Sequence, residues 1–193
     1  LFITPLKFPV PEREQEMIKH SKKSRLLIKE LGKEIEVYQY GNSERKILLV
    51  HGWSGRGTQM VKIAKKLVKN NYQVISFDAP AHGNSPGKTT MMNEFISAIH
   101  AVEETYGMFE FAIGHSLGGI SLLNAVKQGL NITKLITIGA GNSINDICHL
   151  FVQNLELKPV VAEMMKNKFD TLFEEDIENY SSYIAAKDVT IPV

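Results

Sequence analysis

The fold of this 193-residue chain is decided by residues 109–120, FEFAIGHSLGGI. The first five residues form an apolar, strand-like run, and a helical pattern follows the glycines, so Ser116 falls on the turn between a strand and a helix. A turn this tight strains the serine backbone, so the residues two positions to either side must lack bulk, and Gly114 and Gly118 meet that requirement. The pattern predicts that Ser116 is a nucleophile at the carboxyl edge of a sheet rather than an incidental serine in a glycine-rich turn.

Strand-like and helix-like segments alternate on both sides of this turn. Nearly continuous apolar runs, which are typical of parallel strands buried on both faces, occur at Lys46–Val50, Gln73–Phe77 and Leu135–Ile138. Apolar positions at helical spacing lie between these runs, in residues 60–68 and 92–106. Alternation of this kind predicts a sheet whose strands are joined by crossover helices.

The segment before these strands has a different pattern. Residues Arg25 to Tyr40 alternate weakly around Gly32 and end at Gly41-Asn42-Ser43, which predicts a β-hairpin. Taken together, the segments predict an α/β fold, in which a mostly parallel sheet carries helices on both faces and follows an N-terminal antiparallel hairpin.

The alternation stops after the fourth parallel strand, because residues 145–187 contain no strand-like run. Residues 147–155 predict one helix, and a second is predicted from Pro159, since proline is tolerated at the start of a helix. We expect the Met and Phe side chains here to pack the segment rather than to line an acyl pocket. We therefore expect a core at residues 1–140, a helical insertion at 141–187 and the start of a further core strand at 188–193, with the remaining C-terminal strands absent from this sequence.

Composition and charge exclude several classes of function. Lys+Arg number 22 and Asp+Glu 21, a formal net charge of +1, so no overall field favours nucleic acid. No apolar run approaches the roughly 20 residues needed to cross a membrane. The single cysteine, Cys148, excludes an internal disulfide framework and suggests a cytoplasmic protein. The six histidines lack paired spacing, so no metal site is predicted, and the oligomeric state is left open.

A second loop supports a nucleophilic role for Ser116. His51-Gly52-Trp53-Ser54-Gly55 follows a buried strand, where enzymes with such a serine place the other half of an oxyanion hole. The backbone N–H groups of Trp53 and Leu117 are expected to converge on the developing oxyanion. Gly52 allows close approach of the backbone, and His51 is expected to hold its loop by hydrogen bonds rather than to act as a base.

The chain resembles the α/β-hydrolase superfamily, in particular small bacterial members with an HGW-type loop and a short helical cap. Three motifs carry the resemblance, and they occur in the same order along the chain as in that family. The motifs are His51-Gly52-Trp53, the loop DAPAHGNS at residues 78–85, and the turn at Ser116. The resemblance implies that residues 141–187 form the cap and that His82 lies in a structural loop. The resemblance also implies that several neighbouring residues hold the serine turn and the loop of the oxyanion hole in place. These residues are His51, Gly52, Gly114, His115 and Gly118.

The resemblance also implies where the rest of a catalytic triad lies. The family order is nucleophile, then an acid after a later strand, then a histidine, so the acid and the histidine are expected beyond Val193. The 193-residue segment alone is then expected to lack a complete triad. Asp146 would be a triad acid at a position that is less common in the family. His149 lies in the expected cap, where no family motif places the triad histidine. Neither residue is therefore favoured as a member of the triad.

The function implied by the resemblance is that of a serine hydrolase. It would cleave a carboxylic ester or a thioester with a small-molecule acyl group, through a covalent acyl-enzyme on Ser116 and without a cofactor. Two alternatives are a peptidase or amidase of the same fold and a catalytically silent protein that binds a ligand or a partner in the same cavity.

Overall fold

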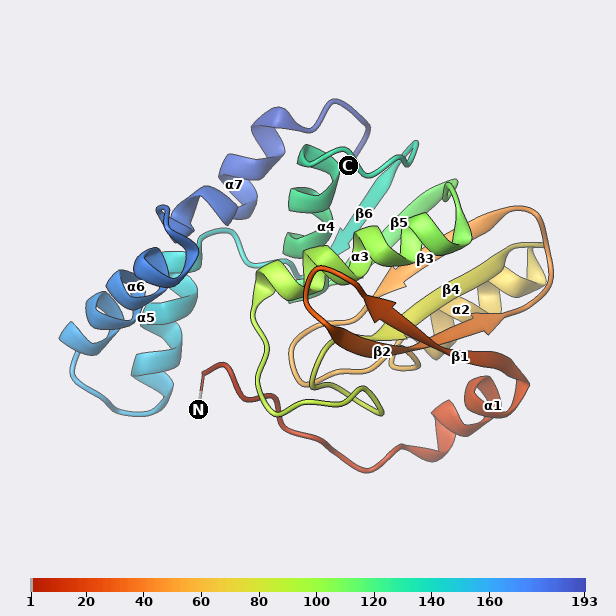
Figure 1. Ribbon diagram of the computed structural model, residues 1–193, viewed down its shortest axis with the longest axis horizontal. Coiled ribbons are helices and arrows are strands. Elements are labelled where there is room, and N and C mark those ends of the chain that lie inside the picture. Colours follow the sequence, from red (N-terminus) through yellow and green to blue (C-terminus); the bar gives the residue numbers. More distant parts are fainter. Residues whose placement is uncertain (1) are drawn as a thin grey trace.

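A six-stranded mixed sheet forms the centre of the computed structural model, which describes residues 2–193 (Figure 1). The spatial order of the strands is β1-β2-β4-β3-β5-β6. β1, β2 and β4 pair antiparallel in turn, whereas β4, β3, β5 and β6 pair parallel. The strand bounds are β1 Ser21–Ile28, β2 Lys33–Tyr40, β3 Lys46–Val50, β4 Gln73–Asp78, β5 Phe111–His115 and β6 Leu135–Ile138.

Helices cover both faces of this sheet. They are α1 Glu12–His20, α2 Val61–Lys69, α3 Met92–Tyr106, α4 Leu117–Lys127, α5 Ile144–Asn154, α6 Val160–Phe173 and α7 Ser182–Ala185, with short 3-10 turns at Ile177–Tyr180 and Ala186–Asp188. The side chains of β3 alternate between the two faces, as those of a strand must. Leu48 and Val50 join the core under α3 and α4, whereas Ile47 and Leu49 join a smaller cluster with α2 and with Met17 of α1.

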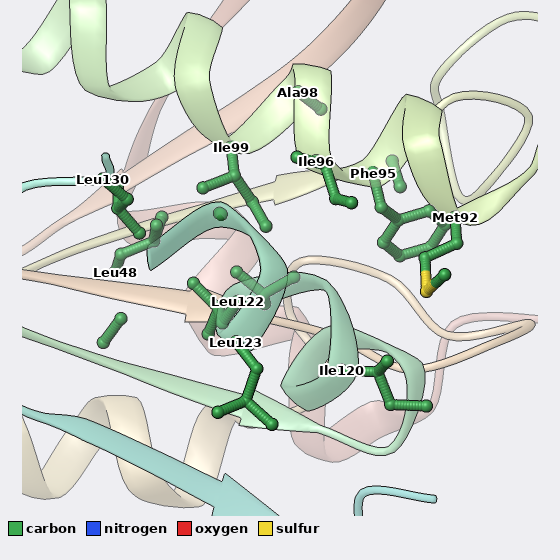
Figure 2. Packing of buried hydrophobic residues seen from close by; sticks show 14 of the residues in the cluster. Leu48, Met92, Phe95, Ile96, Ala98, Ile99, Ile120, Leu122, Leu123 and Leu130 are labelled. Atoms are coloured by element: carbon green, nitrogen blue, oxygen red, sulfur yellow. The ribbon is translucent and has the colours of Figure 1, made fainter. Parts of the chain in front are cut away.

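Figure 2 shows the larger core from close by. Phe95 and Ile99 point down from α3, and Ile120 and Leu122 of α4 face them, with Leu48 of β3 on the sheet side. Because this packing fixes α4 against β3, it also fixes the start of α4, where the serine turn lies.

The predicted α/β fold is confirmed, including the antiparallel hairpin and the parallel core. One strand is displaced from its predicted bounds: β5 begins at Phe111, not at Phe109. Phe109 is fully buried ahead of the strand. Hydrophobic patterning therefore included a core residue that lies outside the ladder, because burial and strand pairing give the same apolar signal.

Helix α1 was not predicted from the sequence. Its residues, EREQEMIKH, are mostly charged, and only Glu14 and Met17 are buried. The Glu14 carboxylate accepts a hydrogen bond from Thr58 Oγ1 at 2.7 Å and lies 3.7 Å from Arg56 Nε. A long-range polar contact thus helps to hold a helix whose own sequence has too little apolar periodicity to indicate one.

The segment after the cap differs from its prediction. Residues 188–193, expected to begin a further core strand, form no strand within the described part of the chain. A single backbone hydrogen bond, from Leu135 N to Pro192 O at 2.9 Å, joins the segment to the start of β6. Pro192 has no N–H to donate, and one isolated bond does not make a ladder.

No helix within residues 2–193 is both long enough and apolar enough to span a membrane.

Candidate active site

The serine turn has the predicted geometry. β5 ends at His115, α4 begins at Leu117, and Ser116 between them has φ 51° and ψ −120°. A positive φ is uncommon for a residue with a side chain and costs on the order of 1–3 kcal/mol. The surroundings enforce it: Ser116 N donates to Ile138 O of β6 at 2.9 Å, and Ser116 O accepts from Gly119 N at 2.9 Å.

Close approach of the backbone explains the glycines on either side. A Cβ atom on Gly114 would lie 2.5 Å from Gly118 O, and one on Gly118 would lie 2.3 Å from Val50 O at the end of β3. Neither space can hold a carbon atom. These two residues therefore allow α4 to start directly against the ends of β3 and β5.

The loop after β3 packs onto the serine turn. A Cβ atom on Gly52 would lie 3.0 Å from Ser116 Cβ and 3.0 Å from His115 O, so Gly52 brings the two segments together. A hydrogen bond of 3.0 Å from Gly55 N to Gly52 O closes the loop around Trp53. Within residues 2–193, no hydrogen-bond acceptor is found for the backbone N–H of Trp53 or of Leu117. The two N–H groups are thus left without a partner among the described residues.

His51 is fully buried behind this loop and is held there as a neutral ring. Its Nδ1 lies 2.7 Å from Gly52 O, which can only accept, so Nδ1 carries the proton. Its Nε2 accepts from Ala79 N at 3.0 Å. Burial lowers the pKa of His51 to about 4. Both ring nitrogens therefore form hydrogen bonds with the backbone of the loops after β3 and β4.

His82 repeats this arrangement one loop away. Its Nδ1 donates to Pro80 O at 3.0 Å, and its Nε2 accepts from Ser54 N at 3.0 Å. Burial, and after it the neighbouring His51 ring, lowers the pKa of His82 to about 3. The ring also packs edge-on against Trp53, with centroids 5.2 Å apart. His82 thereby connects the loop after β4 to the loop after β3.

Asp78 organises the same pair of loops. Its carboxylate accepts from Tyr38 Oη at 3.0 Å and from the backbone N–H groups of Gly57 and Asn84, each at 2.7 Å. Burial raises the pKa of Asp78 in spite of these three donors. Because the hydrogen-bond partners of its carboxylate are Tyr38, Gly57 and Asn84, Asp78 joins the loops after β3 and β4 to β2.

His115, expected to support the serine turn, lies directly before Ser116 at the end of β5. Its Nδ1 is buried without a hydrogen-bond partner among the described residues. A Cβ atom on Gly52 would lie 3.0 Å from that nitrogen, so the ring packs against the oxyanion loop.

Ser116, Trp53 and Leu117 line a common cavity of about 510 Å³. Apolar side chains from the cap form much of its wall, among them Ile147, Phe151 and Phe169. Phe151 and Phe169 pack against the core, as predicted for the Met and Phe side chains of this segment, and they also line the cavity. The apolar spacing that marked them as helical cannot distinguish these two roles.

Within residues 2–193, no histidine, aspartate or glutamate lines this cavity. Asp146 and His149 are exposed on α5, where the Asp146 backbone N–H donates to the capping Ser143 Oγ at 3.1 Å. The structure thus brings together Ser116, Trp53 and Leu117, and does not bring Asp146 or His149 to them.

Several residues that line the cavity were not assigned to the site in the sequence analysis. Phe2 and Ile3 line the cavity, although they precede the first predicted strand by some 20 residues. No pattern marked them, because their contacts are with segments far along the chain. Thr90, Met91 and Met92, at the start of α3, also line the cavity and carry no motif.

Comparison with known proteins agrees with this geometry. The family model Hydrolase_4, described as serine aminopeptidase, S33, matches residues 41–181. A serine hydrolase-like protein of Dictyostelium discoideum is 29% identical over 102 residues, which are 50% of this chain and 28% of that protein. The matched part therefore spans well under a third of that relative.

Solved structures show the same fold. An esterase of Pyrococcus furiosus matches with a TM-score of 0.70 and 16% identity, covering 98% of this chain and 74% of that one. An esterase of Exiguobacterium antarcticum matches with a TM-score of 0.60 and 17% identity, covering 88% of this chain and 74% of that one. A monoacylglycerol lipase of Paleococcus ferrophilus matches with a TM-score of 0.54, 25% identity, and 61% and 51% coverage.

The family model covers more than two thirds of the chain and includes both the loop after β3 and the serine turn. The chain belongs to the Hydrolase_4 family of the α/β-hydrolase superfamily.

Proposed function

We propose that this protein is a serine hydrolase that cleaves a carboxylic ester or a thioester through an acyl-enzyme on Ser116. The observation that carries the proposal is the strained turn, which presents Ser116 to an apolar cavity beside two free backbone N–H groups. A strained nucleophile next to preorganised donors is the arrangement that acyl transfer requires.

The proposed reaction has two steps. Ser116 Oγ attacks the carbonyl carbon and gives its proton to a general base, while the Trp53 and Leu117 N–H groups bind the oxyanion of the tetrahedral intermediate. The intermediate expels the alcohol or thiol, which takes that proton, and leaves the acyl group on Oγ. Water then attacks the acyl-enzyme, the acid is released, and Ser116 regains its proton.

The general base is not assigned to any histidine of residues 2–193. His51 and His82 use both ring nitrogens in loop hydrogen bonds, and burial lowers the pKa of each. The acid and the histidine of the triad, expected from the resemblance beyond Val193, stay a prediction.

The cavity favours an ester or thioester over a peptide. The wall of the cavity within residues 2–193 is largely apolar, which suits the acyl chain of an ester or a thioester. The esterases and the lipase among the structural neighbours agree with this choice, whereas the family description, serine aminopeptidase, supports the peptidase as the second candidate.

The experiment is active-site labelling of the full-length protein. We expect a fluorophosphonate probe to modify Ser116, located by mass spectrometry, and to leave the Ser116→Ala variant unmodified. Short-chain aryl esters should then be hydrolysed faster than aminoacyl anilides. A folded protein that is neither labelled nor active would instead indicate a silent binding protein, and faster anilide cleavage would indicate a peptidase.

A further inference from the structure

The segment that precedes α1, residues 2–8, crosses the outside of the loops that surround Ser116. We call it the N-terminal strap. Figure 1 shows it running from beside α5 across to α1. It has no regular secondary structure, so its position depends on contacts with the rest of the molecule.

Four hydrogen bonds attach the strap to the core side of the cavity. They reach the oxyanion loop, the loop after β4 and the segment before α3. The bonds are Leu6 N to Ser54 Oγ at 3.0 Å, Arg56 Nη2 to Phe8 O at 2.8 Å, Lys7 Nζ to Ser85 O at 3.0 Å, and Thr90 N to Ile3 O at 3.0 Å. The strap is therefore held by the same loops that position Trp53.

The end of the strap reaches the cap side of the cavity. The Phe2 ring lies edge-on to Phe151 of α5, with centroids 4.8 Å apart, and 5.4 Å from the ring of Phe169 of α6. Both separations are in the favourable range for aromatic pairs. All three rings line the cavity that Ser116 also lines. Phe2 thus joins the cap to a strap anchored on the core.

We propose that Phe2 limits the length of the acyl chain that the cavity accepts. This inference rests on the proposed function, because it takes the cavity as the acyl site of Ser116. The Phe2 ring occupies apolar space between α5 and α6 that an unbranched chain would otherwise fill. Phe151 and Phe169 belong to the cap helices, whereas Phe2 comes from an irregular segment, so its side chain can be changed without altering a helix.

The chain offers its own probe of binding. Trp53 is the single tryptophan of these 193 residues and lines the cavity, so the fluorescence change that is lost in a Trp53→Phe variant reports what enters, whether or not Ser116 reacts. Straight-chain carboxylic acids of four to fourteen carbons, the products of the proposed reaction, would be titrated into the full-length protein. Each methylene that enters an apolar site should strengthen binding roughly fourfold. We expect the affinity to stop increasing at the chain length at which the end of the chain contacts the Phe2 ring.

The variants change that limit in opposite directions. Phe2→Ala should extend the gain by two or more carbons, and Phe2→Trp should shorten it. Phe8→Ala is the matched control, because Phe8 lies on the same strap, is 56% exposed and does not line this cavity. If Phe2→Ala does not fold, Phe2→Leu takes its place, with a smaller extension expected.

The outcomes separate this inference from the proposed function. Chain-length profiles in which the Phe2 variants match Phe8→Ala would overturn the inference even if Ser116 is labelled by the fluorophosphonate. A shifted profile in a protein that is not labelled would overturn the hydrolase and retain the role of Phe2. A wild-type protein whose Trp53 responds to no acid would also overturn the inference.

Discussion

At the scale of single residues, the main feature is the backbone of Ser116. Its φ of 51° is imposed by hydrogen bonds to Ile138 and Gly119, so the strain belongs to the fold and not to the hydroxyl group. A residue without a side chain would adopt this conformation without that strain. This backbone conformation therefore lowers the free energy of unfolding, but it suits a nucleophile because it turns the side chain of Ser116 away from the sheet.

We predict that Ser116→Gly is more stable than Ser116→Ala. Relief of strain should contribute about 1–3 kcal/mol, and the added freedom of the unfolded glycine should cost about 0.4–1 kcal/mol. The expected net difference in the free energy of unfolding is about 1 kcal/mol, measured by urea denaturation. At Ser121, inside α4, the same pair of substitutions should give the opposite order, because helical glycine costs about 1 kcal/mol relative to alanine. Equal stabilities at position 116 would mean that the turn is unstrained.

At the scale of elements, the site depends on how closely α4 approaches β3. Gly118 lies in the first turn of α4, against the backbone oxygens of Val50 and His51. Those oxygens end β3 and begin the oxyanion loop. A side chain at Gly118 must therefore displace the helix that carries the serine or the loop that carries Trp53.

We predict that Gly118→Ala lowers the free energy of unfolding by on the order of 1–3 kcal/mol and abolishes labelling of Ser116. Its Cβ would lie 2.3 Å from Val50 O. Gly119→Ala is the matched variant, and a smaller loss is expected from it, since its nearest contact would be the Ala140 Cβ at 3.0 Å, which requires a smaller shift than the backbone contact at Gly118. Thermal melting and fluorophosphonate labelling are measured on both variants. A labelled Gly118→Ala protein with an unchanged melting temperature would contradict the packing described here.

At the scale of the whole molecule, two buried neutral histidines join the loops of the site to the core. The rings of His51 and His82 lie 5.0 Å apart, and each contacts Phe95 of α3. In the unfolded chain both rings titrate near pH 6.5, whereas in the folded protein their pKa values are about 4 and about 3. Their stabilising effect is complete above the unfolded pKa and is lost as the pH falls toward the folded values.

We predict a loss of about 2 kcal/mol in the free energy of unfolding for each ring between pH 7 and pH 5. The raised pKa of Asp78 acts in the opposite direction, so the comparison is made between variants. His82→Gln should remove about half of the pH dependence, whereas His149→Gln, on the exposed surface of α5, should leave it unchanged. Urea denaturation at the two pH values measures both. A His82→Gln protein with the wild-type pH dependence would show that this ring is not buried as a neutral group.

The sequence by itself determined the local parts of the fold and of the candidate site. The hairpin around Gly32, the parallel strands and the turn at Ser116 all leave patterns within a few residues, through alternation, continuous apolar runs and paired glycines. Gly114 and Gly118 could be identified in advance because a tight turn excludes bulk at fixed positions. These features follow from the geometry of the backbone, which neighbouring residues control.

Only the tertiary structure decided which distant segments meet. It placed β3 between β4 and β5, held the charged helix α1 through Glu14 and Thr58, and left residues 188–193 without a strand. It also brought Phe2 to Phe151 and so built a wall of the cavity from two segments that are far apart in the sequence. Such contacts form between surfaces that are complete only after folding, and a local sequence pattern describes one of the two surfaces at most.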